Sequence, residues 1–581
     1  MVNLPKDLKD LEAISPAKSL FIGNIQTECL FPYPDPLAKD RESLNLIIDS
    51  IDKFLGGKAS EVKAYEKKGA QPDDFIQSLR ELGLFGLIIP EENGGLGLTN
   101  SGYSRVLQQV TRYDGSTSLT IGAHSSIGLK GLLLFGNEQQ KTKYLPKLAS
   151  GETIAAFCLT ESGAGSDAAS IKTKAEKQSD GSWILNGEKI WITNGPIADF
   201  FTVFAKTESE GGKISAFIVE RSFAGVATGP KEEKMGIRAS ATSTVSFTNV
   251  KVPAENLLGE EGKGFKVAMN ILNNGRTGLG GGCVGAMKRA ISLATAQANQ
   301  RKQFGKSISE FALIKEKIAN MTVAAYVTES LVGLVGHFID SDVQDYSVEA
   351  AISKIVASES LWYVSNEALQ IAGGNGFMSE YPYENIVRDS RINLIFEGTN
   401  EILRLYVALS GFQYAGDYLK EVTDFFKAPI KGFGIFSDYT SKKISRISPI
   451  KRDSFPFLPE SLQSYGAVLG AHTLQLSGAV ENALKTHKKN IVGQQLLSKR
   501  IADITIDLFS GLAVLSRVAK SYKENGDEKS AFEQKILKIF MQNAKRKMNY
   551  NLRRIDRNED NESLALGEEI LRRGEFGWDL L

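Results

Sequence analysis

The sequence is poor in the residues that build disulfide frameworks and histidine metal sites. Its 581 residues include three cysteines and four histidines. Cys29, Cys158 and Cys283 are far apart and have no metal-ligand spacing, which fits a reduced compartment without structural disulfides. The scattered histidines argue against a histidine-based metal site. We therefore expect no bound metal.

Net charge and long apolar runs are also missing. Lys plus Arg (69) nearly cancel Asp plus Glu (68), so no overall field attracts nucleic acid. No uninterrupted apolar run is long enough to span a bilayer, and the first residues, MVNLPKDLKDLEAISPAKSLF, lack the apolar core of a signal peptide. We expect a cytoplasmic protein, or a processed organellar one in the mitochondrial matrix.

The spacing of apolar residues changes several times along the chain, which is too long for one core. The spacing is helical first, then has a period of two with Asn186-Gly187 and Asn194-Gly195 as hairpin signals, and is then helical again. The predicted class is α+β multidomain, with the middle domain an antiparallel barrel or sandwich. The expected segments are an extended arm (1–40), a helical domain (41–152), a β domain (153–260), a helical bundle (261–410), a basic linker (411–460) and an additional helical domain (461–581).

The stretch from Arg391 to Leu405, RINLIFEGTNEILRL, joins an apolar run to a predicted helix. Gly398 can adopt backbone conformations that other residues avoid, and Thr399 or Asn400 can cap the helix. Glu397 then lies on a short loop, where apolar burial raises the pKa of a carboxyl group and a helix N-terminus lowers it. By position alone, a carboxylate that helps to cap the helix is the commoner explanation.

Three other segments give weak signals when each is taken alone. The small-residue loop from Thr160 to Asp167 exposes backbone N–H groups that can bind phosphate or a polar ring edge, but such loops are more often plain turns. Trp191 offers a flat surface for a ring cofactor, although a core tryptophan is commoner. The glycines between Gln370 and Phe377 lack the strand-then-helix context of a dinucleotide fold.

Together, in this order, the segments resemble the acyl-CoA dehydrogenase family. The likeness is greatest to its very-long-chain branch, which includes a relative that assists the assembly of respiratory complex I. It covers nearly the whole chain, and the tail beyond about residue 410 is specific to the branch. The matching segments are FCLTESGAGSD (Phe157–Asp167), WITNG (Trp191–Gly195), ILNNGR (Ile271–Arg276), RKQFGK (Arg301–Lys306), QIAGGNGF (Gln370–Phe377) and IFEGTNEILRL (Ile395–Leu405).

The resemblance implies that FAD lies between the β domain and the bundle. Trp191 is expected to pack on the flavin with Thr193 near its N5 edge, and the segments at Arg301 and Gln370 to bind FAD across a dimer interface. The implied cofactor-binding residues are Phe157, Leu159, Thr160, Gly165, Ser166, Trp191, Ile192, Thr193, Arg301, Gln303, Phe304, Gln370, Gly373, Gly374, Thr399 and Glu401. The implied substrate-binding residues are Ser166, Asn273, Arg276, Phe396 and Gly398, with Gly128 and Gly131 at the acyl chain.

The implied reaction is the α,β-dehydrogenation of a long-chain or very-long-chain acyl-CoA to a trans-2-enoyl-CoA in fatty-acid β-oxidation. Glu397 is expected to remove the α-proton while its backbone N–H, with a ribityl hydroxyl of the flavin, binds the thioester oxygen, and the β-hydrogen leaves as hydride to flavin N5. Some relatives place the base beside the position of Arg276, where this chain has Gly275, which cannot act as a base. Two other functions stay open: an acyl-CoA oxidase that uses O2, and an assembly scaffold that keeps the fold without catalysis.

Chain length and partners are further expectations. Gly128 and Gly131 share a face of a predicted helix, where missing side chains leave room for a long acyl tail or, alternatively, let helices pack closely. Residues 425–457 mix basic and apolar side chains, which suits a peripheral membrane contact, for example at an inner membrane, or a solvated linker. The resemblance implies a homodimer and an electron-transfer flavoprotein as electron acceptor.

Overall fold

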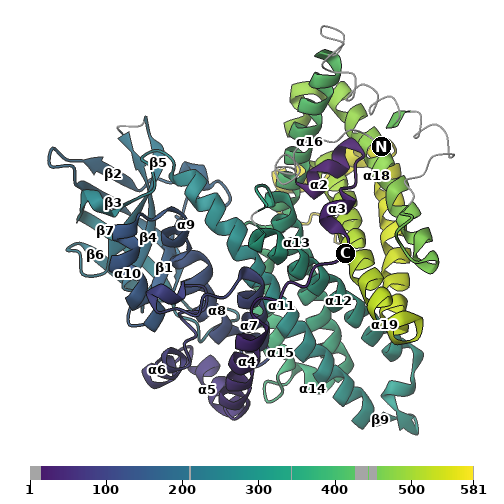
Figure 1. Cartoon of the computed structure of the whole chain (residues 1–581), viewed down its shortest axis with the longest axis horizontal. Coiled ribbons are helices and arrows are strands. Elements are labelled where there is room, and N and C mark those ends of the chain that lie inside the picture. Colours follow the sequence, from purple (N-terminus) through teal and green to yellow (C-terminus); the bar gives the residue numbers. More distant parts are fainter. Residues whose placement is uncertain (1–14, 209–210, 342, 425–441, 444–454, 580–581) are drawn as a thin grey trace. The chain divides into compact units, whose positions relative to one another are not determined.

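The computed structural model describes residues 15–208, 211–341, 343–424, 442–443 and 455–579. The chain forms two compact units, Pro34–Ile402 and a second made of Met1–Tyr33 with Leu403–Leu581. The first unit contains a group of N-terminal helices, a β domain and a helical bundle, and the second is helical where it is described (Figure 1). The predicted order of helical, β and helical domains, followed by further helices, is confirmed.

Short helices make up the first part of the first unit. Thr99 begins α7 by accepting a hydrogen bond from the N–H of Gly102, and Asp114 begins α8 in the same way through Thr117. Between α8 and α9 the chain makes a π-helical turn, a rare geometry that is frequent at functional sites. The elements are α4 (Arg41–Gly56), α5 (Ala59–Lys68), α6 (Asp73–Glu81), η2 (Glu91–Asn93), α7 (Asn100–Thr111), α8 (Gly115–Gly122), η3 (Ala123–Gly128), α9 (Lys130–Phe135) and α10 (Glu138–Ser150).

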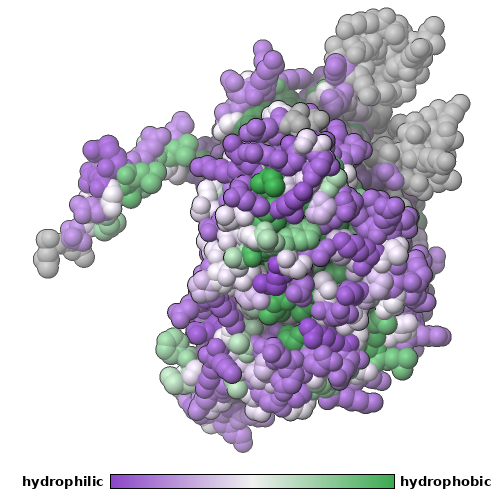
Figure 2. All heavy atoms as spheres, turned by 90° about the vertical axis from the view of Figure 1, so that its left-hand side faces the viewer, coloured by the Kyte–Doolittle hydropathy of each residue, from purple (hydrophilic) through white to green (hydrophobic). Residues whose placement is uncertain are grey.

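The β domain is one sheet with strand order β6-β7-β3-β2-β4-β5-β8. Most neighbouring strands are antiparallel, as predicted, but β1 and β2 each pair with β4 in parallel. The face of the first unit seen in Figure 2 is largely hydrophilic, with apolar side chains in small separate groups, because the apolar residues of strands such as β4 are buried. The strands are β1 (Ala155–Cys158), β2 (Lys174–Lys177), β3 (Trp183–Thr193), β4 (Phe200–Thr207), β5 (Lys213–Glu220), β6 (Val226–Lys231), β7 (Thr242–Val252) and β8 (Leu257–Leu258).

The hairpin predicted at Asn186-Gly187 is wrong, because both residues lie inside the continuous strand β3. The pairing with β7 shifts register there, so the two residues form a bulge. The Asn186 side chain accepts a 2.8 Å hydrogen bond from the N–H of Asn249 on β7. A Cβ at Gly187 would lie 2.4 Å from Oγ1 of Thr173, so this close approach requires glycine.

The bundle is organised around α11, which packs on α7, α12 and α13. Close crossing with α7 depends on glycines, since a Cβ at Gly281 would lie 2.3 Å from the carbonyl oxygen of Ser104. At Gly285 the same distance to the carbonyl oxygen of Gln108 would be 2.1 Å. The elements are α11 (Gly264–Gln300), β9 (Lys302–Gln303), β10 (Lys306–Ser307), α12 (Ala312–Asp340), α13 (Ser347–Ala372), α14 (Gly374–Phe377), α15 (Tyr383–Arg391) and η8 (Ile392–Leu394).

Among the described residues, α12 is the one helix whose length and mean hydropathy would allow it to cross a membrane. It packs on α7, α11 and α13, and just over half (56%) of its most apolar window is buried inside the protein. Lys317 and Glu329 interrupt its apolar residues. This composition is also that of a core helix, and α12 occupies such a position in the bundle.

The second unit contains a helical hairpin within α19. Gly526 has φ 79° and ψ 177°, which breaks the helix in the middle. A Cβ at Gly511 would lie 3.4 Å from the sulfur of Met541, so the two halves of α19 lie side by side. The elements are α2 (Pro16–Ser19), η1 (Leu20–Ile22), α3 (Thr27–Leu30), α16 (Asn400–Asp424, whose first residues belong to the first unit), α18 (Glu460–His487), η9 (Lys488–Gly493), α19 (Gln495–Asp556) and α20 (Asp560–Arg573).

The arm predicted to be extended over residues 1–40 contains three short helices, α2, η1 and α3, in its described part, and the chain between and after them is irregular. Leu20 and Phe21 are fully buried, and Phe21 fills the space over Gly411 on α16, where a Cβ would lie 2.1 Å from its ring. Apolar residues that need burial, rather than the prolines, decide the structure here. Most of the basic segment 425–457 lies outside the described residues.

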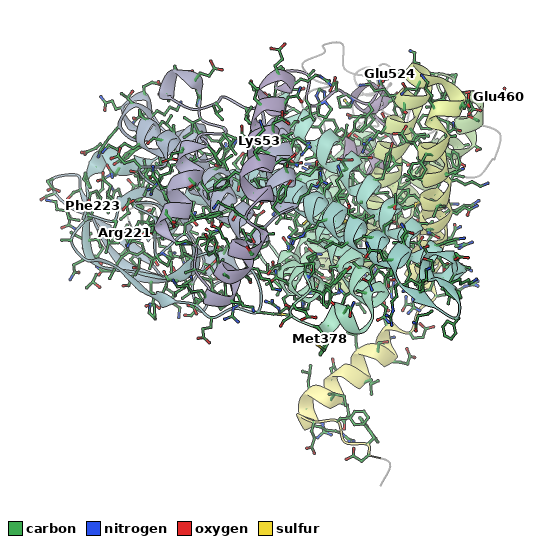
Figure 3. All side chains as sticks on the ribbon, turned by 90° about the horizontal axis from the view of Figure 1, so that it is seen from below. Lys53, Arg221, Phe223, Met378, Glu460 and Glu524 are labelled. Atoms are coloured by element: carbon green, nitrogen blue, oxygen red, sulfur yellow. The ribbon has the colours of Figure 1, made fainter. Side chains whose placement is uncertain are left out.

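The last helix, α20, buries none of its residues. Figure 3 shows it as the yellow helix that leaves the other helices of the second unit at the bottom of the view. The start of the helix is anchored, because Arg500 on α19 forms an ion pair with Asp560. The helix therefore contributes little apolar burial to the folded chain.

Candidate active site

Glu397 lies on a short loop between η8 and α16, as the sequence predicts. Its backbone has φ 55° and Gly398 has φ 94°, so two consecutive residues adopt the left-handed region. The N–H of Ile402 lies 3.4 Å from Oγ1 of Thr399, which caps α16. A glutamate with positive φ is strained, and such strain is concentrated at functional sites.

The carboxyl group of Glu397 is held away from water. Its Oε2 atom is buried and has no hydrogen-bond partner among the described residues. Burial raises the pKa of Glu397, and the nearby charges of Arg276 and Lys354 oppose this increase. Its Oε1 atom lies 3.7 Å from the position that a Cβ would take at Gly275. Some relatives have the base at the position of Gly275, and this position and Glu397 therefore face the same space. Of these two positions, only Glu397 supplies a carboxyl group in this chain.

Buried cations bind the backbone of this loop. Arg276, which is 6% exposed, donates a 3.3 Å hydrogen bond to the carbonyl oxygen of Glu397 and a 2.7 Å bond to Oδ1 of Asn273. Lys354 on α13 donates to the carbonyl oxygen of Gly398 at 2.8 Å. Lys354 was not predicted from the sequence. The signal for it was a single lysine inside the apolar run AAISKIVA, since a buried lysine is nearly always paired.

The small-residue loop after β1 is fixed by a buried ion pair. Lys189 on β3 lies 2.7 Å from Oε1 of Glu161 and also donates to the carbonyl oxygen of Leu159. Glu161 further accepts hydrogen bonds from the N–H and hydroxyl groups of Thr173. Burial alone would raise the pKa of Glu161, but Lys189 and the other donors outweigh it and the pKa is lowered. This pair was also missed by sequence reasoning.

The rest of that loop is open. Thr160 is half-buried and its carbonyl oxygen accepts a hydrogen bond from the N–H of Ile190. Gly165 and Ser166 are exposed, and a Cβ at Gly165 would contact nothing within 4 Å. Phe157 is half-buried, whereas Leu159 belongs to the core. The loop can therefore offer exposed backbone and hydroxyl groups to a ligand.

Trp191 is turned out of the sheet. It has φ 57° and is 64% exposed, while its neighbour Ile192 is 2% exposed in the core. A register shift between Lys189 and Ile192 in the pairing with β7 produces this orientation. The alternative of a core tryptophan is therefore wrong. The side chain of Thr193 is half-buried on the same strand end.

The residues expected at a dimer interface are exposed in the single chain. Phe304, at the turn between β9 and β10, is 93% exposed and has φ 53°. Gly373, at the end of α13, has φ 61°, and a Cβ there or at Gly374 would contact nothing within 4 Å. Arg301, Gln303 and Gln370 are exposed as well. The open backbone and the exposed ring of Phe304, which contacts Phe311 edge to face, leave room for a ligand or a partner, and the roles of these residues stay predictions.

The expected acyl-tail opening at two glycines is not what the structure shows. A Cβ at Gly128 would lie 2.8 Å from that of Ala155, and one at Gly131 would lie 2.9 Å from Cδ1 of Ile271. Both glycines therefore allow close packing, which was the alternative explanation. Phe396 is half-buried and Glu401 is exposed beside the Glu397 loop.

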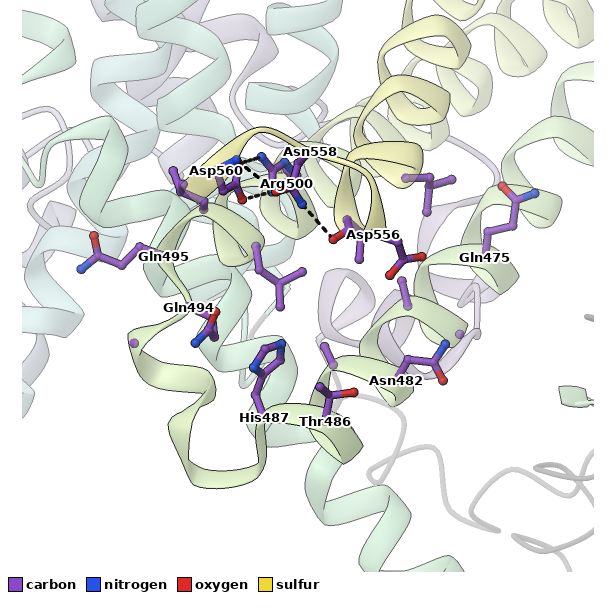
Figure 4. A pocket seen from close by; sticks show the side chains of 18 of the residues that line it. Gln475, Asn482, Thr486, His487, Gln494, Gln495, Arg500, Asp556, Asn558 and Asp560 are labelled. Carbon is purple, nitrogen blue, oxygen red and sulfur yellow. Dashed lines mark hydrogen bonds and ion pairs between the residues drawn. The ribbon is translucent and has the colours of Figure 1, made fainter. Parts of the chain in front are cut away.

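A cavity of about 910 Å³ lies in the second unit, lined by α18, α19 and the start of α20 (Figure 4). Its lining mixes aliphatic and polar residues, among them Asn482, His487 and the ion-paired Arg500 and Asp560. It contains none of the residues predicted for catalysis or cofactor binding. Two places in the first unit therefore remain as candidate parts of an active site: the loop of Glu397 with its buried cations, and the open loop after β1 with Trp191.

Four family models match the chain. They are the N-terminal (residues 41–152), middle (156–250) and C-terminal (262–411) domains of acyl-CoA dehydrogenase, and the ACAD9/ACADV C-terminal domain (460–572). The first three models together match more than half of the chain.

Individual relatives agree with these models. The very long-chain specific acyl-CoA dehydrogenase of Bos taurus, a mitochondrial protein, is 46% identical over 87% of this chain and 79% of its own. The crystal structure of an acyl-CoA dehydrogenase complexed with FAD from Bacillus anthracis is 34% identical, with a TM-score of 0.81 over 94% of each chain. The butyryl-CoA dehydrogenase of Megasphaera elsdenii is 38% identical, with a TM-score of 0.62 over 65% of this chain and 99% of its own.

The relatives come from mitochondria and from bacteria, so they fit either of the two expected compartments. The match extends from the N-terminal helices through the sheet and the bundle to the helices beyond residue 460. By sequence and by fold, the chain belongs to the acyl-CoA dehydrogenase family.

Proposed function

We propose that this protein binds FAD and oxidises the Cα–Cβ bond of a long-chain acyl-CoA, giving a trans-2-enoyl-CoA. The observation that carries the proposal is the carboxyl group of Glu397, which is buried, has an oxygen without a partner in the described chain, and sits on a strained loop. A base with these properties suits the removal of a weakly acidic α-proton. Membership of the family supports the same reaction.

The residues of the chain suit the steps that precede oxidation. In this proposal Glu397 takes the α-proton, and its backbone N–H donates a hydrogen bond to the thioester oxygen, on which negative charge develops. Arg276 holds the carbonyl oxygen of Glu397 and thereby the orientation of the loop. FAD, when bound, supplies the acceptor for the β-hydrogen as hydride. An acyl chain that fills the space beside Gly275 displaces water and raises the pKa of Glu397 further.

The proposed FAD site uses the open loop and Trp191. Exposed backbone at Gly165 and the Ser166 hydroxyl can bind polar groups of the cofactor, and the exposed face of Trp191 can cover its ring. Thr160, Thr193 and Thr399 would add hydroxyl contacts. The segments at Phe304 and Gly373 would complete the site across a homodimer interface.

Similarity to known proteins supports the proposed substrate length and the cofactor. The Bos taurus protein is specific for very long chains by name, and a model from the same branch matches residues 460–572, so we propose a long-chain substrate. The structure of Bacillus anthracis is an FAD complex by title, which supports FAD as the cofactor. We propose that the electrons pass to an electron-transfer flavoprotein and that the reaction belongs to fatty-acid β-oxidation. We also propose that the protein associates peripherally with a membrane through residues 425–457.

The decisive experiment is an absorbance spectrum of the purified protein before and after addition of palmitoyl-CoA without oxygen. We expect a bound flavin that bleaches, and we expect slower bleaching with octanoyl-CoA. Peroxide formation in air without an added acceptor would instead favour the oxidase. A colourless protein that takes up no FAD would favour the assembly scaffold and contradict the proposal.

A further inference from the structure

The loop of Glu397 is held by two cations that bind consecutive carbonyl groups. Arg276 on α11 donates to the carbonyl oxygen of Glu397 at 3.3 Å. Lys354 on α13 donates to the carbonyl oxygen of Gly398 at 2.8 Å. The two residues with positive φ are therefore fixed from two different helices. Arg276 was expected near the substrate, but nothing in the sequence analysis assigns a role to Lys354.

Lys354 is also connected to the start of α16. Its side chain is fully buried, and Nζ donates a second hydrogen bond, 2.9 Å long, to Oδ1 of Asn400. The Asn400 amide in turn donates to Oγ of Ser358 at 3.0 Å and to Oε1 of Glu359 at 3.1 Å. Each polar atom that Lys354 contacts is thus fixed by a second interaction or by the backbone. A buried ammonium group is costly in free energy, which argues that its position serves the loop.

We propose that Lys354 is a positioning residue for proton abstraction: it fixes the loop of Glu397 in its left-handed conformation, and its charge favours the ionised carboxylate. The inference rests on the proposed function, because it assigns a role to the neighbour of the proposed base. Lys354 does not have to touch the substrate, since it acts through the carbonyl of Gly398 and through its electric field.

The charged and titratable groups around Glu397 support this role. Arg276 and Cys283 face it from α11, Lys354 from α13 and Tyr103 from α7. Burial raises the pKa of Cys283 to about 12 and also raises that of Tyr103, so both stay neutral at physiological pH.

Burial lowers the pKa of Lys354 to about 8, so its ammonium group is still protonated at neutral pH and below. Glu359, one turn further along α13, also faces Lys354 and helps to keep it charged. The pKa of Glu397 is therefore raised by burial and lowered by two cations, Arg276 and Lys354.

The test uses a palmitoyl-CoA analogue with sulfur in place of the β-carbon, incubated with the flavin-loaded protein in D2O. This analogue can lose its α-proton but has no β-hydrogen to give, so NMR of the α-position measures proton abstraction alone. In Lys354→Met we expect the acidic limb of the exchange rate to move to higher pH by about one unit, as for a carboxylate that loses an opposite charge nearby. Below that limb the exchange is then about tenfold slower than in the wild type.

The matched control is Lys130→Met. Lys130 is also buried, but it donates to Asn100 and interacts with the charge of Asp340, so its loss should leave the acidic limb in place. Should Lys354→Met not fold or not retain flavin, Lys354→Gln replaces it. Glutamine keeps an N–H donor for the carbonyl of Gly398 but lacks the charge, and we expect the same shift of the limb.

Two failures can be told apart. Wild-type protein that neither exchanges the α-proton nor bleaches with palmitoyl-CoA contradicts the proposed function itself. Wild-type exchange that depends on Glu397, combined with an unshifted acidic limb in the Lys354 variants, overturns the role of Lys354 alone. A loss of rate that is equal at every pH overturns the part of the proposal that assigns a role to the charge of Lys354, because it reveals only the hydrogen bond to the loop.

Discussion

Glu397 occupies a backbone conformation that costs about 1–3 kcal/mol for a residue other than glycine. The cost is met by the hydrogen bonds from Arg276 and Lys354 to the two carbonyl groups of the loop. A glutamate that only capped a helix would need neither the strain nor the burial of an oxygen without a partner among the described residues. At the scale of single residues, the geometry therefore favours the base over the cap.

Replacing the proposed base should separate cofactor binding from chemistry. Glu397→Gln keeps the size of the side chain, so we expect the yellow colour to remain. The rate of bleaching by palmitoyl-CoA should fall by about 10²–10⁴-fold, the range for loss of a general base. Stopped-flow absorbance measures both. Glu92→Gln, an exposed acid on η2, is the control, and normal bleaching in Glu397→Gln would place the base elsewhere.

The same substitution should stabilise the fold at neutral pH. The pKa of Glu397 is raised above its ordinary 4.5 by burial, so with rising pH the carboxyl group ionises first in the unfolded chain. Between the two pKa values the folded chain binds more protons, and the free energy of unfolding falls as pH rises. Glutamine removes this loss, and Tm should rise by about 2 °C.

Circular dichroism at two pH values provides the measurement. The gain in Tm should vanish at a pH below 4.5, where the carboxyl group is protonated in both states. Equal or lower Tm of Glu397→Gln at neutral pH would contradict the raised pKa.

At the scale of elements, periodicity and resemblance predict helices, strands and the location of the site, but not the details of pairing. Asn186-Gly187 has the composition of a hairpin turn, yet β3 continues through it because β7 pairs along its whole length. The prolines of the N-terminal arm suggest an extended chain, whereas Leu20 and Phe21 decide its packing. Long-range contacts, strand pairing in the first case and burial in the second, outweigh the local signals.

The residues that sequence reasoning missed are those whose role depends on partners distant in the chain. Lys354 contacts Gly398 across 44 positions, and Lys189 contacts Glu161 across 28. No local spacing reveals such pairs. Trp191 was predicted through resemblance, but its orientation follows from a register shift that only the paired strands define.

Breaking the ion pair between Lys189 and Glu161, which fixes the loop after β1, should lower both the free energy of unfolding and the amount of bound flavin. Lys189→Met leaves Glu161 buried without its cation, and removal of one partner of a buried pair costs about 3–5 kcal/mol. Urea unfolding and the flavin content of the purified protein measure the two effects. Lys174→Met breaks the exposed pair with Glu208 in the same domain and should cost less than about 1 kcal/mol. Equal losses in the two variants would contradict the structural role of Lys189.

The crossing of α11 over α7 gives a sharp test of packing. In Gly281→Ala the new methyl group would lie 2.3 Å from the carbonyl oxygen of Ser104, so the helices must separate and stability should fall. In Gly282→Ala the nearest atom, Oγ1 of Thr111, is 3.3 Å away. Because alanine favours the helix by about 1 kcal/mol over glycine, Gly282→Ala should be neutral or stabilising. Thermal melts give the Tm of both variants. A lower Tm for Gly282→Ala than for Gly281→Ala would contradict the close crossing of the two helices.

At the scale of the whole molecule, the last helix and the hairpin of the second unit contribute differently to stability. A chain that ends after Asn561 loses most of α20, which buries none of its residues, so we expect Tm to change by less than about 1 °C. A chain that ends after Gly526 loses Ile536, Leu537 and Met541 from the core, and its second unit should unfold. Scanning calorimetry measures both. A large loss of Tm in the first truncation would show that α20 is covered, for example by a second copy of the chain.

The turn at Gly526 has a practical consequence. Its φ of 79° with ψ of 177° is accessible only to glycine, and the residues from Lys523 to Lys529 around it are exposed. The backbone can therefore be cut there and given new ends, or a foreign peptide can be spliced in, while the helices on either side keep their packing. A reporter placed at this position would follow the folding of the second unit.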